Sequence, residues 1–264
     1  MGKSIGILSL KGGVGKTSVT VSLGDALSRI GKKVLLVDGN FSAPNLGLHL
    51  NIVDPEFTLH DVLNRTANIK DAISELDNFD VISSRIFTNV KINPFDLKDK
   101  LKNLKNRYDV ILIDSSPNLN EETLAVMLAS DEIFIVTTPD RPTLSTTLKA
   151  VKLAKQRGTT INGLILNKVY NKGFEIDLED IENTIDIPVL AVIPHDINFP
   201  KSLSEFTPFT SYKPNSIATM EYKKLAGALI GEKYNLGFSF RNFLNFSPKR
   251  EEINREIFYD RQFK

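Results

Sequence analysis

The residues with the clearest chemical potential lie in one glycine-rich segment near the N-terminus. Residues 11–18 read Lys-Gly-Gly-Val-Gly-Lys-Thr-Ser, between a strand-like apolar run and a helical pattern. Glycines let backbone N–H groups approach phosphate oxygens, and the N-terminus of the following helix adds a positive dipole. The second lysine can reach β- and γ-phosphates, and the hydroxyl after it can ligate Mg²⁺. We therefore predict a nucleotide-phosphate site made by Lys11, Gly12, Gly13, Val14, Gly15, Lys16, Thr17 and Ser18.

The alternative interpretation of this segment is a glycine-rich turn that only joins a strand to a helix. Such a turn does not need three glycines, two lysines and a threonine in this order. The combination favours a phosphate-binding loop, in which Ser18 could touch the α-phosphate.

A second candidate nucleotide element is the apolar run over residues 110–113, which ends in Asp114. Ligands of α/β folds bind at the carboxyl ends of the strands, so this carboxylate is expected beside the glycine-rich loop. There it would hold Mg²⁺ through a water molecule, and with Thr17 it forms the predicted metal site. The alternative is an aspartate that only caps the loop after the strand.

Composition excludes several classes of site. The chain of 264 residues has no cysteine, which rules out disulfides, thiolate zinc sites and cysteine-ligated iron–sulfur clusters. The formal net charge of +1 predicts no bulk attraction to nucleic acid. No apolar run approaches the roughly 18 residues that a membrane span needs, and the N-terminus does not resemble a signal peptide. We expect a cytoplasmic protein.

Short apolar runs alternate with helical patterns, which is typical of βαβ units. Strands are predicted over residues 5–10, 34–38, 79–83, 110–114, 133–137, 163–166 and 189–193. Helices are predicted over residues 17–30, 97–104, 121–129, 143–156 and 217–229. The expected fold class is α/β, a doubly wound and mostly parallel sheet with helices on both faces. One domain is expected over residues 1–235, followed by an aromatic segment and a charged tail over residues 236–264.

The glycine-rich loop resembles that of the deviant Walker A P-loop ATPases of the MinD/ParA family, whose mark is a second lysine at the start of the loop, here Lys11. The resemblance covers residues 3–235 and is closest to MinD-like proteins. It implies ATP or ADP and Mg²⁺ as ligands. It also implies an ATP-dependent homodimer in which Lys11 reaches the partner's ATP. Leu10 stands where the ordinary Walker pattern has glycine, at a position that varies within this family.

The first switch of this family corresponds to residues 37–48, whose Asn-Leu-Gly-Leu run looks like MinD. In the family, an aspartate two residues after the position of Asp38 orients the attacking water. Here Asn40 occupies that place. An amide accepts a hydrogen bond but carries no charge and takes up no proton, so we expect tight binding and slow hydrolysis of ATP. Asp38 is the possible substitute for the missing carboxylate.

The resemblance also indicates where the adenine would bind. Asn167 ends a predicted strand at the place where family members contact adenine, and an amide can both donate to and accept from its edge. Pro194 and Asp196 resemble the segment that closes the same pocket. The alternative for Asn167 is a turn residue at a strand end. His195 is expected to be a loop residue rather than a metal ligand.

Three functions stay open within the resemblance. A MinD-like ATPase would position the division site or another cargo, under the control of an activating protein partner. A ParA-like ATPase would partition DNA, which the near-neutral charge supports less, although four lysines could form a basic face: Lys201, Lys213, Lys223 and Lys224. A scaffold would bind ATP, dimerise and hydrolyse little.

Whether the protein binds a membrane depends on its C-terminal segment. Leu236, Phe240, Phe243 and Leu244 share one helical stripe, so residues 236–246 could lie on a membrane surface and make the protein a peripheral membrane protein. Equally, these side chains could pack on the domain. A charged tail follows them, whereas in MinD the amphipathic helix normally ends the chain.

Overall fold

The computed structural model describes residues 2–88, 90–232 and 249–263. Its centre is an eight-stranded sheet in the order β3-β4-β2-β5-β1-β6-β7-β8. The described strand pairs are parallel except β3 with β4, which are antiparallel. The strands are β1 (Lys3–Leu8), β2 (Val34–Gly39), β3 (Ser74–Glu75), β4 (Asp80–Ile82), β5 (Val110–Ser115), β6 (Glu132–Thr137), β7 (Thr160–Val169) and β8 (Val189–Pro194).

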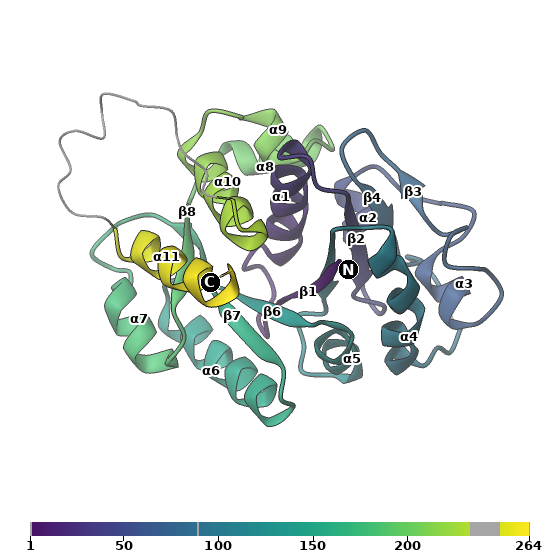
Figure 1. Cartoon of the computed structure of the whole chain (residues 1–264), viewed down its shortest axis with the longest axis horizontal. Helices are drawn as coiled ribbons and strands as arrows, with labels where there is room; N and C mark the ends of the chain where they lie inside the picture. The colour runs from purple at the N-terminus through teal and green to yellow at the C-terminus, as the bar shows by residue number, and fades with distance from the viewer. Residues whose placement is uncertain (1, 89, 233–248, 264) are drawn as a thin grey trace.

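Helices cover both faces of this sheet (Figure 1). One layer contains α1 (Lys16–Arg29), α2 (Leu46–His49), α8 (Asn198–Ser204), α9 (Phe209–Tyr212) and α10 (Ile217–Ile230). The other contains α3 (Leu59–Leu63), α4 (Leu97–Lys102), α5 (Glu121–Ala129), α6 (Arg141–Gln156) and α7 (Leu178–Ile185), with the 3₁₀ turns η1 (Pro94–Asp96) and η2 (Asn103–Asn106). A separate apolar core lies under each layer. The predicted fold class, doubly wound and mostly parallel with helices on both faces, is confirmed.

The central strands are buried on both faces, and this explains why their sequences are nearly continuous apolar runs. In β2, for example, Leu36 packs into the core under α1 while Leu35 and Val37 pack into the other core. The strand predictions therefore found the right segments, with shifted ends. β1 ends at Leu8 rather than Leu10, because the chain leaves the sheet at Ser9 to enter the glycine-rich loop.

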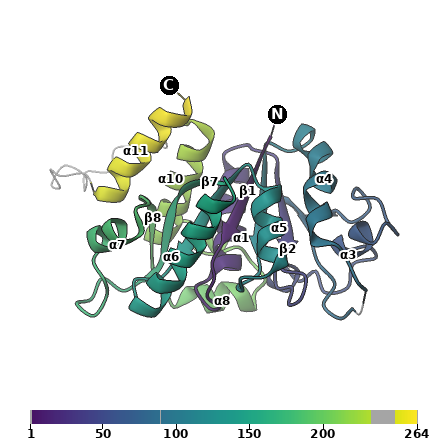
Figure 2. The same ribbon diagram turned by 90° about the horizontal axis from the view of Figure 1, so that it is seen from below.

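The charged stretch after Pro248 forms a helix, α11 (Arg250–Phe263), where the sequence indicated only a tail. It lies beside the edge strand β8 and helix α10 (Figures 1 and 2). Its polar side chains reach the strand: Asn254 Nδ2 donates to the Val189 carbonyl at 2.8 Å, and Arg255 Nη1 donates to the Leu190 carbonyl at 2.9 Å. An edge strand offers unpaired backbone groups, and α11 uses side chains to occupy two of them. The aromatic stripe predicted over residues 236–246 lies outside the described residues.

The anchor of α11 is a buried ion pair. Arg255 Nη1 lies 2.8 Å from Glu221 Oε2 on α10, and both side chains are 7% exposed. Removing one member of a buried pair leaves the other charge without its compensation, which costs more than an exposed pair contributes. Arg255 therefore joins α11, α10 and the edge strand at one point.

We predict that Arg255→Ala lowers the free energy of unfolding by about 3 kcal/mol, because Glu221 stays buried with only Lys224, at 3.4 Å, as a described cationic partner. Urea denaturation followed by far-UV circular dichroism measures the change. The exposed Arg261→Ala on the same helix is the matched control, expected within about 0.5 kcal/mol of the parent. Equal losses in the two variants would show that the buried pair does not anchor α11.

Candidate functional site

The glycine-rich loop connects β1 to α1, as predicted, and its backbone requires glycine at two positions. Gly13 has φ of +80° and Gly15 has φ of +91°, in the left-handed region that favours glycine. A Cβ on Gly12 or Gly13 would meet nothing within 4 Å, so the loop borders open space on the side of these residues. The first turn of α1 follows directly, with partly exposed Thr17 and Ser18. The loop therefore offers room and unpaired backbone N–H groups for a phosphate chain.

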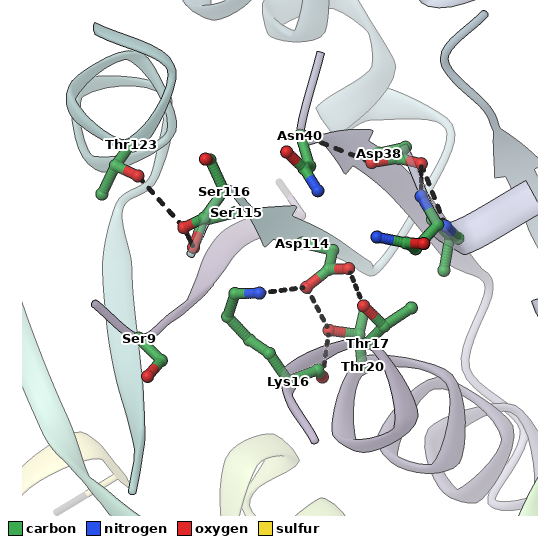
Figure 3. A network of polar contacts seen from close by, with 12 residues as sticks. Ser9, Lys16, Thr17, Thr20, Asp38, Asn40, Asp114, Ser115, Ser116 and Thr123 are labelled. Atoms are coloured by element: carbon green, nitrogen blue, oxygen red, sulfur yellow. Dashed lines mark hydrogen bonds and ion pairs between the residues drawn. The ribbon is translucent and has the colours of Figure 1, made fainter. Parts of the chain in front are cut away.

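Lys16, Thr17 and Asp114 meet at the base of this loop (Figure 3). Lys16 Nζ lies 3.8 Å from Asp114 Oδ1, and the Thr17 hydroxyl donates to Asp114 Oδ2 at 2.6 Å. Lys16 is 8% exposed and Asp114 is 1% exposed. Carboxylate and hydroxyl oxygens side by side are the ligand type that Mg²⁺ prefers, so these residues fit the expected metal. The carboxylate also restrains the lysine that would meet the phosphates.

Asp38 lies in β2, directly opposite Asp114 in the parallel register with β5. It is completely buried, and its oxygens accept three backbone N–H groups of the first switch: Asn40 to Oδ1 at 3.1 Å, Asn45 to Oδ2 at 3.1 Å and Leu46 to Oδ2 at 3.0 Å. Burial, and then repulsion by Asp114, raise the pKa of Asp38 to about 8, although the three N–H donors act in the opposite direction. Asp38 thus holds the switch backbone against the sheet.

Asn40 lies on the same side of the sheet as Lys16 and Asp114 (Figure 3). Its side chain is 4% exposed, and its Nδ2 donates to the Ala43 carbonyl within the switch. Its Oδ1 is buried and has no hydrogen-bond partner among the described residues. A buried acceptor without a partner is costly unless a ligand or a water molecule satisfies it. The atom of the Asn40 amide that lacks a partner among the described residues is therefore its carbonyl oxygen, which can accept a hydrogen bond.

The phosphate loop is also held from β7. Asn167 Nδ2 donates to the Val14 carbonyl at 2.7 Å, and Lys168 Nζ donates to the Gly13 carbonyl at 2.6 Å. Asn167, expected to read the adenine edge, thus uses its amide nitrogen on the loop. Lys168 was not among the predicted site residues. The available signal was a lysine near the end of an apolar strand that leads to the ligand-binding edge of the sheet.

Of the two residues predicted to close the base pocket, Pro194 ends β8 and Asp196 follows it. Pro194 lines a cavity of about 630 Å³ together with Leu166. Asp196 does not line this cavity; its Oδ1 accepts from Asn198 N at 2.8 Å, and Lys213 lies 3.4 Å from its other oxygen. His195 stacks on Tyr170, with ring centroids 4.4 Å apart. Among the described residues, neither Asn167 nor the phosphate loop lines this cavity, so the structure does not place Pro194 in one pocket with Asn167, and Asp196 shapes the loop after β8.

Lys11 is held by residues outside the phosphate loop. Its Nζ lies 3.1 Å from Asp140 Oδ1 and 2.5 Å from Thr143 Oγ1, at the start of α6. Partial burial acts to raise the pKa of Asp140, but hydrogen bonds from Thr138, Thr143 and Lys11 lower it to about 2, so this carboxylate is charged at neutral pH. In the single chain, Lys11 therefore has a fixed partner in Asp140.

Comparison with known proteins gives a consistent result. The chain matches the family described as "AAA domain" over residues 2–166. It is 33% identical to an uncharacterized ATP-binding protein of Methanocaldococcus jannaschii, over 89% of this chain and 90% of the relative. It is 32% identical to the sporulation initiation inhibitor protein Soj of Bacillus subtilis, over 86% of this chain and 97% of the relative.

A solved structure is similar throughout the described domain. The septum site-determining protein MinD of Pyrococcus horikoshii, complexed with Mg-ADP, superposes with a TM-score of 0.82 at 37% identity, over 87% of this chain and 96% of that one. Among residues 2–88, 90–232 and 249–263, no helix is long and apolar enough to cross a bilayer. With a glycine-rich loop that begins with a second lysine, and with these relatives and this similar structure, the chain belongs to the MinD/ParA family of deviant Walker A P-loop ATPases.

Proposed function

We propose that this protein is an ATP-binding, ATP-dependent dimerising switch of the MinD type that hydrolyses ATP slowly. The observation that carries the proposal is a phosphate cradle built from Lys16, Thr17 and Asp114 beside a neutral Asn40. The cradle supports binding, because charges and backbone donors converge where phosphates would lie. The neutral amide supports slow turnover, because a carboxylate is missing from the position that orients water in the family.

Each residue has a separate task in this proposal. Backbone N–H groups of residues 12–15 and the Lys16 ammonium would bind the phosphates, while Ser18 would touch the first of them. Thr17 and Asp114 would hold Mg²⁺, which neutralises phosphate charge when it is bound. Asn167 and Pro194 would border the base. Asp38 anchors the first switch through three N–H groups, which supports a positioning role for it.

Dimerisation follows from Lys11. Its ammonium is bound to Asp140 in the single chain, and a partner's phosphates would compete with that carboxylate for it. An exposed or half-exposed ion pair is worth little, whereas a charge-assisted bond to phosphate in a closed interface is worth more. Leaving Asp140 for the partner's ATP is therefore favourable only when ATP is present, which makes the dimer nucleotide-dependent.

Spatial positioning is the process that the relatives suggest, since one is a septum site-determining protein and another a sporulation initiation inhibitor. A ParA-like DNA partitioning role is the second candidate. Two of the lysines proposed for a DNA-binding face already have acidic partners, because Lys213 lies 3.4 Å from Asp196 and Lys224 lies 2.6 Å from Glu252. The paired lysines support the MinD-type role over DNA binding.

The first prediction of the proposed function concerns Lys11. Lys11→Ala should bind ATP with Mg²⁺ like the parent but lose the ATP-dependent dimer, because only the bond across the interface is removed. Multi-angle light scattering measures the mass, and titration calorimetry measures ATP binding. Lys16→Ala is the matched control, expected to lose both nucleotide binding and the dimer. A dimer that forms equally in the Lys11 variant, or without ATP, would disprove the proposal.

The second prediction concerns Asn40. Asn40→Asp should hydrolyse bound ATP about 10² to 10³ times faster than the parent in a single turnover, because a charged group then orients the attacking water. Asn40→Ala is the control: if the amide still positions water in part, this variant is slower than the parent. If Asn40→Asp is no faster, Asn40 is not at the catalytic position, and Asp38→Asn is the next variant to measure.

The third prediction concerns membranes, the proposed surface partner of residues 236–246. Truncation at residue 235 would also delete α11, which packs on β8, so substitutions are the cleaner test. We expect the full chain with ATP to co-sediment with anionic-lipid vesicles, and Phe240→Ser with Phe243→Ser to stay in the supernatant, because the apolar stripe is interrupted. Equal pelleting of the two proteins would rule out a membrane anchor in this segment.

A further inference from the structure

A buried histidine on α3 connects the first switch to the segment that follows β4. His60 is 3% exposed, and its Nδ1 accepts a hydrogen bond from the backbone N–H of Arg85 at 3.1 Å. The ring also hydrogen-bonds to the backbone of Phe41, which follows Asn40 in the first switch. The Phe41 ring meets the imidazole edge to face, with the ring centroids 5.9 Å apart. His60 therefore bridges two segments that lie far apart in the sequence.

The partners of the two ring nitrogens determine where the imidazole proton lies. A backbone N–H can only donate, so the Nδ1 that faces Arg85 carries no proton. The proton then lies on Nε2, from which it can be donated to the Phe41 carbonyl. In agreement, the bond to the Phe41 backbone acts to raise the pKa of His60, as a bond from the ring to a carbonyl does. The bridge thus requires a neutral ring in one tautomer.

The segment after β4, residues 83–85, holds other parts of the same region. The Leu59 N–H donates to the Ser83 carbonyl at 2.8 Å, which joins the segment to α3. The Ser84 hydroxyl donates to the Asp38 carbonyl at 2.8 Å, where the first switch leaves β2. His60 extends this support to the next part of the switch.

The surroundings of His60 oppose a second proton on its ring. Burial lowers the pKa of His60 below its ordinary value, and the Arg85 guanidinium acts in the same direction. Asp61 acts to raise this pKa, but its Oδ2 already accepts from Arg85 Nη2 at 2.8 Å. On α5, the charged groups beside the same pocket as His60 are Glu121 and Glu122. The neutral ring that the bridge requires is therefore the form present at pH 7.

A simpler explanation is that His60 only fills space between α3 and the switch, and His49 provides the comparison. His49 ends α2 at the other end of the first switch, and its Nδ1 lies 2.9 Å from the Asn45 carbonyl. That nitrogen donates, so a second proton on the His49 ring leaves its contact intact. The Nδ1 of His60 faces a donor instead, so a proton there removes the contact with Arg85. Space filling alone does not require this difference.

We propose that neutral His60 is a positioning residue for the first switch, and that protonation of its ring disconnects Phe41 from Arg85 as the pH falls. The bridge contains no group assigned to the nucleotide, so it can be tested on the free protein. The link to hydrolysis rests on the proposed function, in which the first switch orients the attacking water. A protein that does not bind ATP would refute that function and leave the test of the bridge unaffected.

The test is an NMR titration of the free protein from about pH 9 to about pH 5, across the range in which histidine titrates. Imidazole nitrogen shifts report the tautomer and the charge of each ring. We expect His60 to carry its proton on Nε2 and to titrate below about pH 6.5, the midpoint of an ordinary histidine. The backbone amides of Phe41 and Arg85 should shift with the same midpoint, because the bridge is complete above it and lost below it. A separate step near pH 8 belongs to Asp38.

The decisive variant is His60→Gln, whose amide can donate to Phe41 but takes up no proton. The acidic step at Phe41 and Arg85 should disappear in this variant, while the Asp38 step near pH 8 remains. His49→Gln is the matched control and should keep both steps. An acidic step that persists in His60→Gln, or that disappears in His49→Gln, would overturn the proposal.

The titration of the parent protein decides the question if His60→Gln does not fold. A proton on Nδ1 of His60 at neutral pH, or a His60 midpoint at or above that of an ordinary histidine, would contradict the bridge. Amides of Phe41 and Arg85 that do not follow the His60 titration would contradict it equally.

The pH profile of hydrolysis tests whether the bridge positions the switch for the reaction. Single-turnover hydrolysis of bound ATP in the parent should fall about tenfold per pH unit below the His60 midpoint. His60→Gln should lack this fall, whereas His49→Gln should keep it. The same fall in His60→Gln as in the parent would overturn the positioning role, whatever the amide titration shows.

Discussion

The whole site depends on two carboxylates that are buried side by side. Asp38 and Asp114 occupy the same register position on neighbouring parallel strands, and both are inaccessible or nearly so. Burial of two carboxylates together disfavours charge on both, which is why the pKa of Asp38 rises to about 8, and the pair needs donors and cations around it. The chain supplies these from two different segments. Backbone N–H groups of the first switch surround Asp38, and Lys16 and Thr17 of the phosphate loop surround Asp114.

This arrangement links the two segments that nucleotide would touch. The sheet holds the carboxylates rigidly, so the switch and the loop each take their position from a strand end, and the strands are hydrogen-bonded to each other. A third carboxylate at position 40 would add negative charge to the same corner. The neutral Asn40 avoids that repulsion, while it gives up the charge that would help to activate water. In the proposed function, the stability of the free protein and the speed of hydrolysis would therefore favour different residues at this position.

Further contacts that support the phosphate loop and the sheet come from β7 and from α11. Asn167 and Lys168 hold carbonyls of the phosphate loop from β7, so the loop is restrained both from β5 and from β7. Beyond them, α11 occupies backbone groups of β8 through Asn254 and Arg255. An edge strand left open can pair with other chains, and a covering helix removes that possibility. The C-terminal helix thus stabilises the sheet whose strand ends carry the site.

The amino-acid sequence alone determined the fold class and the place of the glycine-rich loop between a strand and a helix, because both depend on local patterns. Buried parallel strands are continuous apolar runs, and a phosphate loop needs glycines and a lysine at fixed spacing, as residues 11–18 have. Tertiary structure alone decided what those side chains contact. Lys11 pairs with Asp140, 129 residues away, and Asn167 binds the loop 153 residues before it, contacts that no local pattern encodes. Helix α11 was missed for the same reason. Its buried face carries Glu251 and Arg255, and in the sequence such charged residues indicate an exposed tail. The tertiary structure buries them, because Arg255 pairs with Glu221 and donates to the edge strand β8.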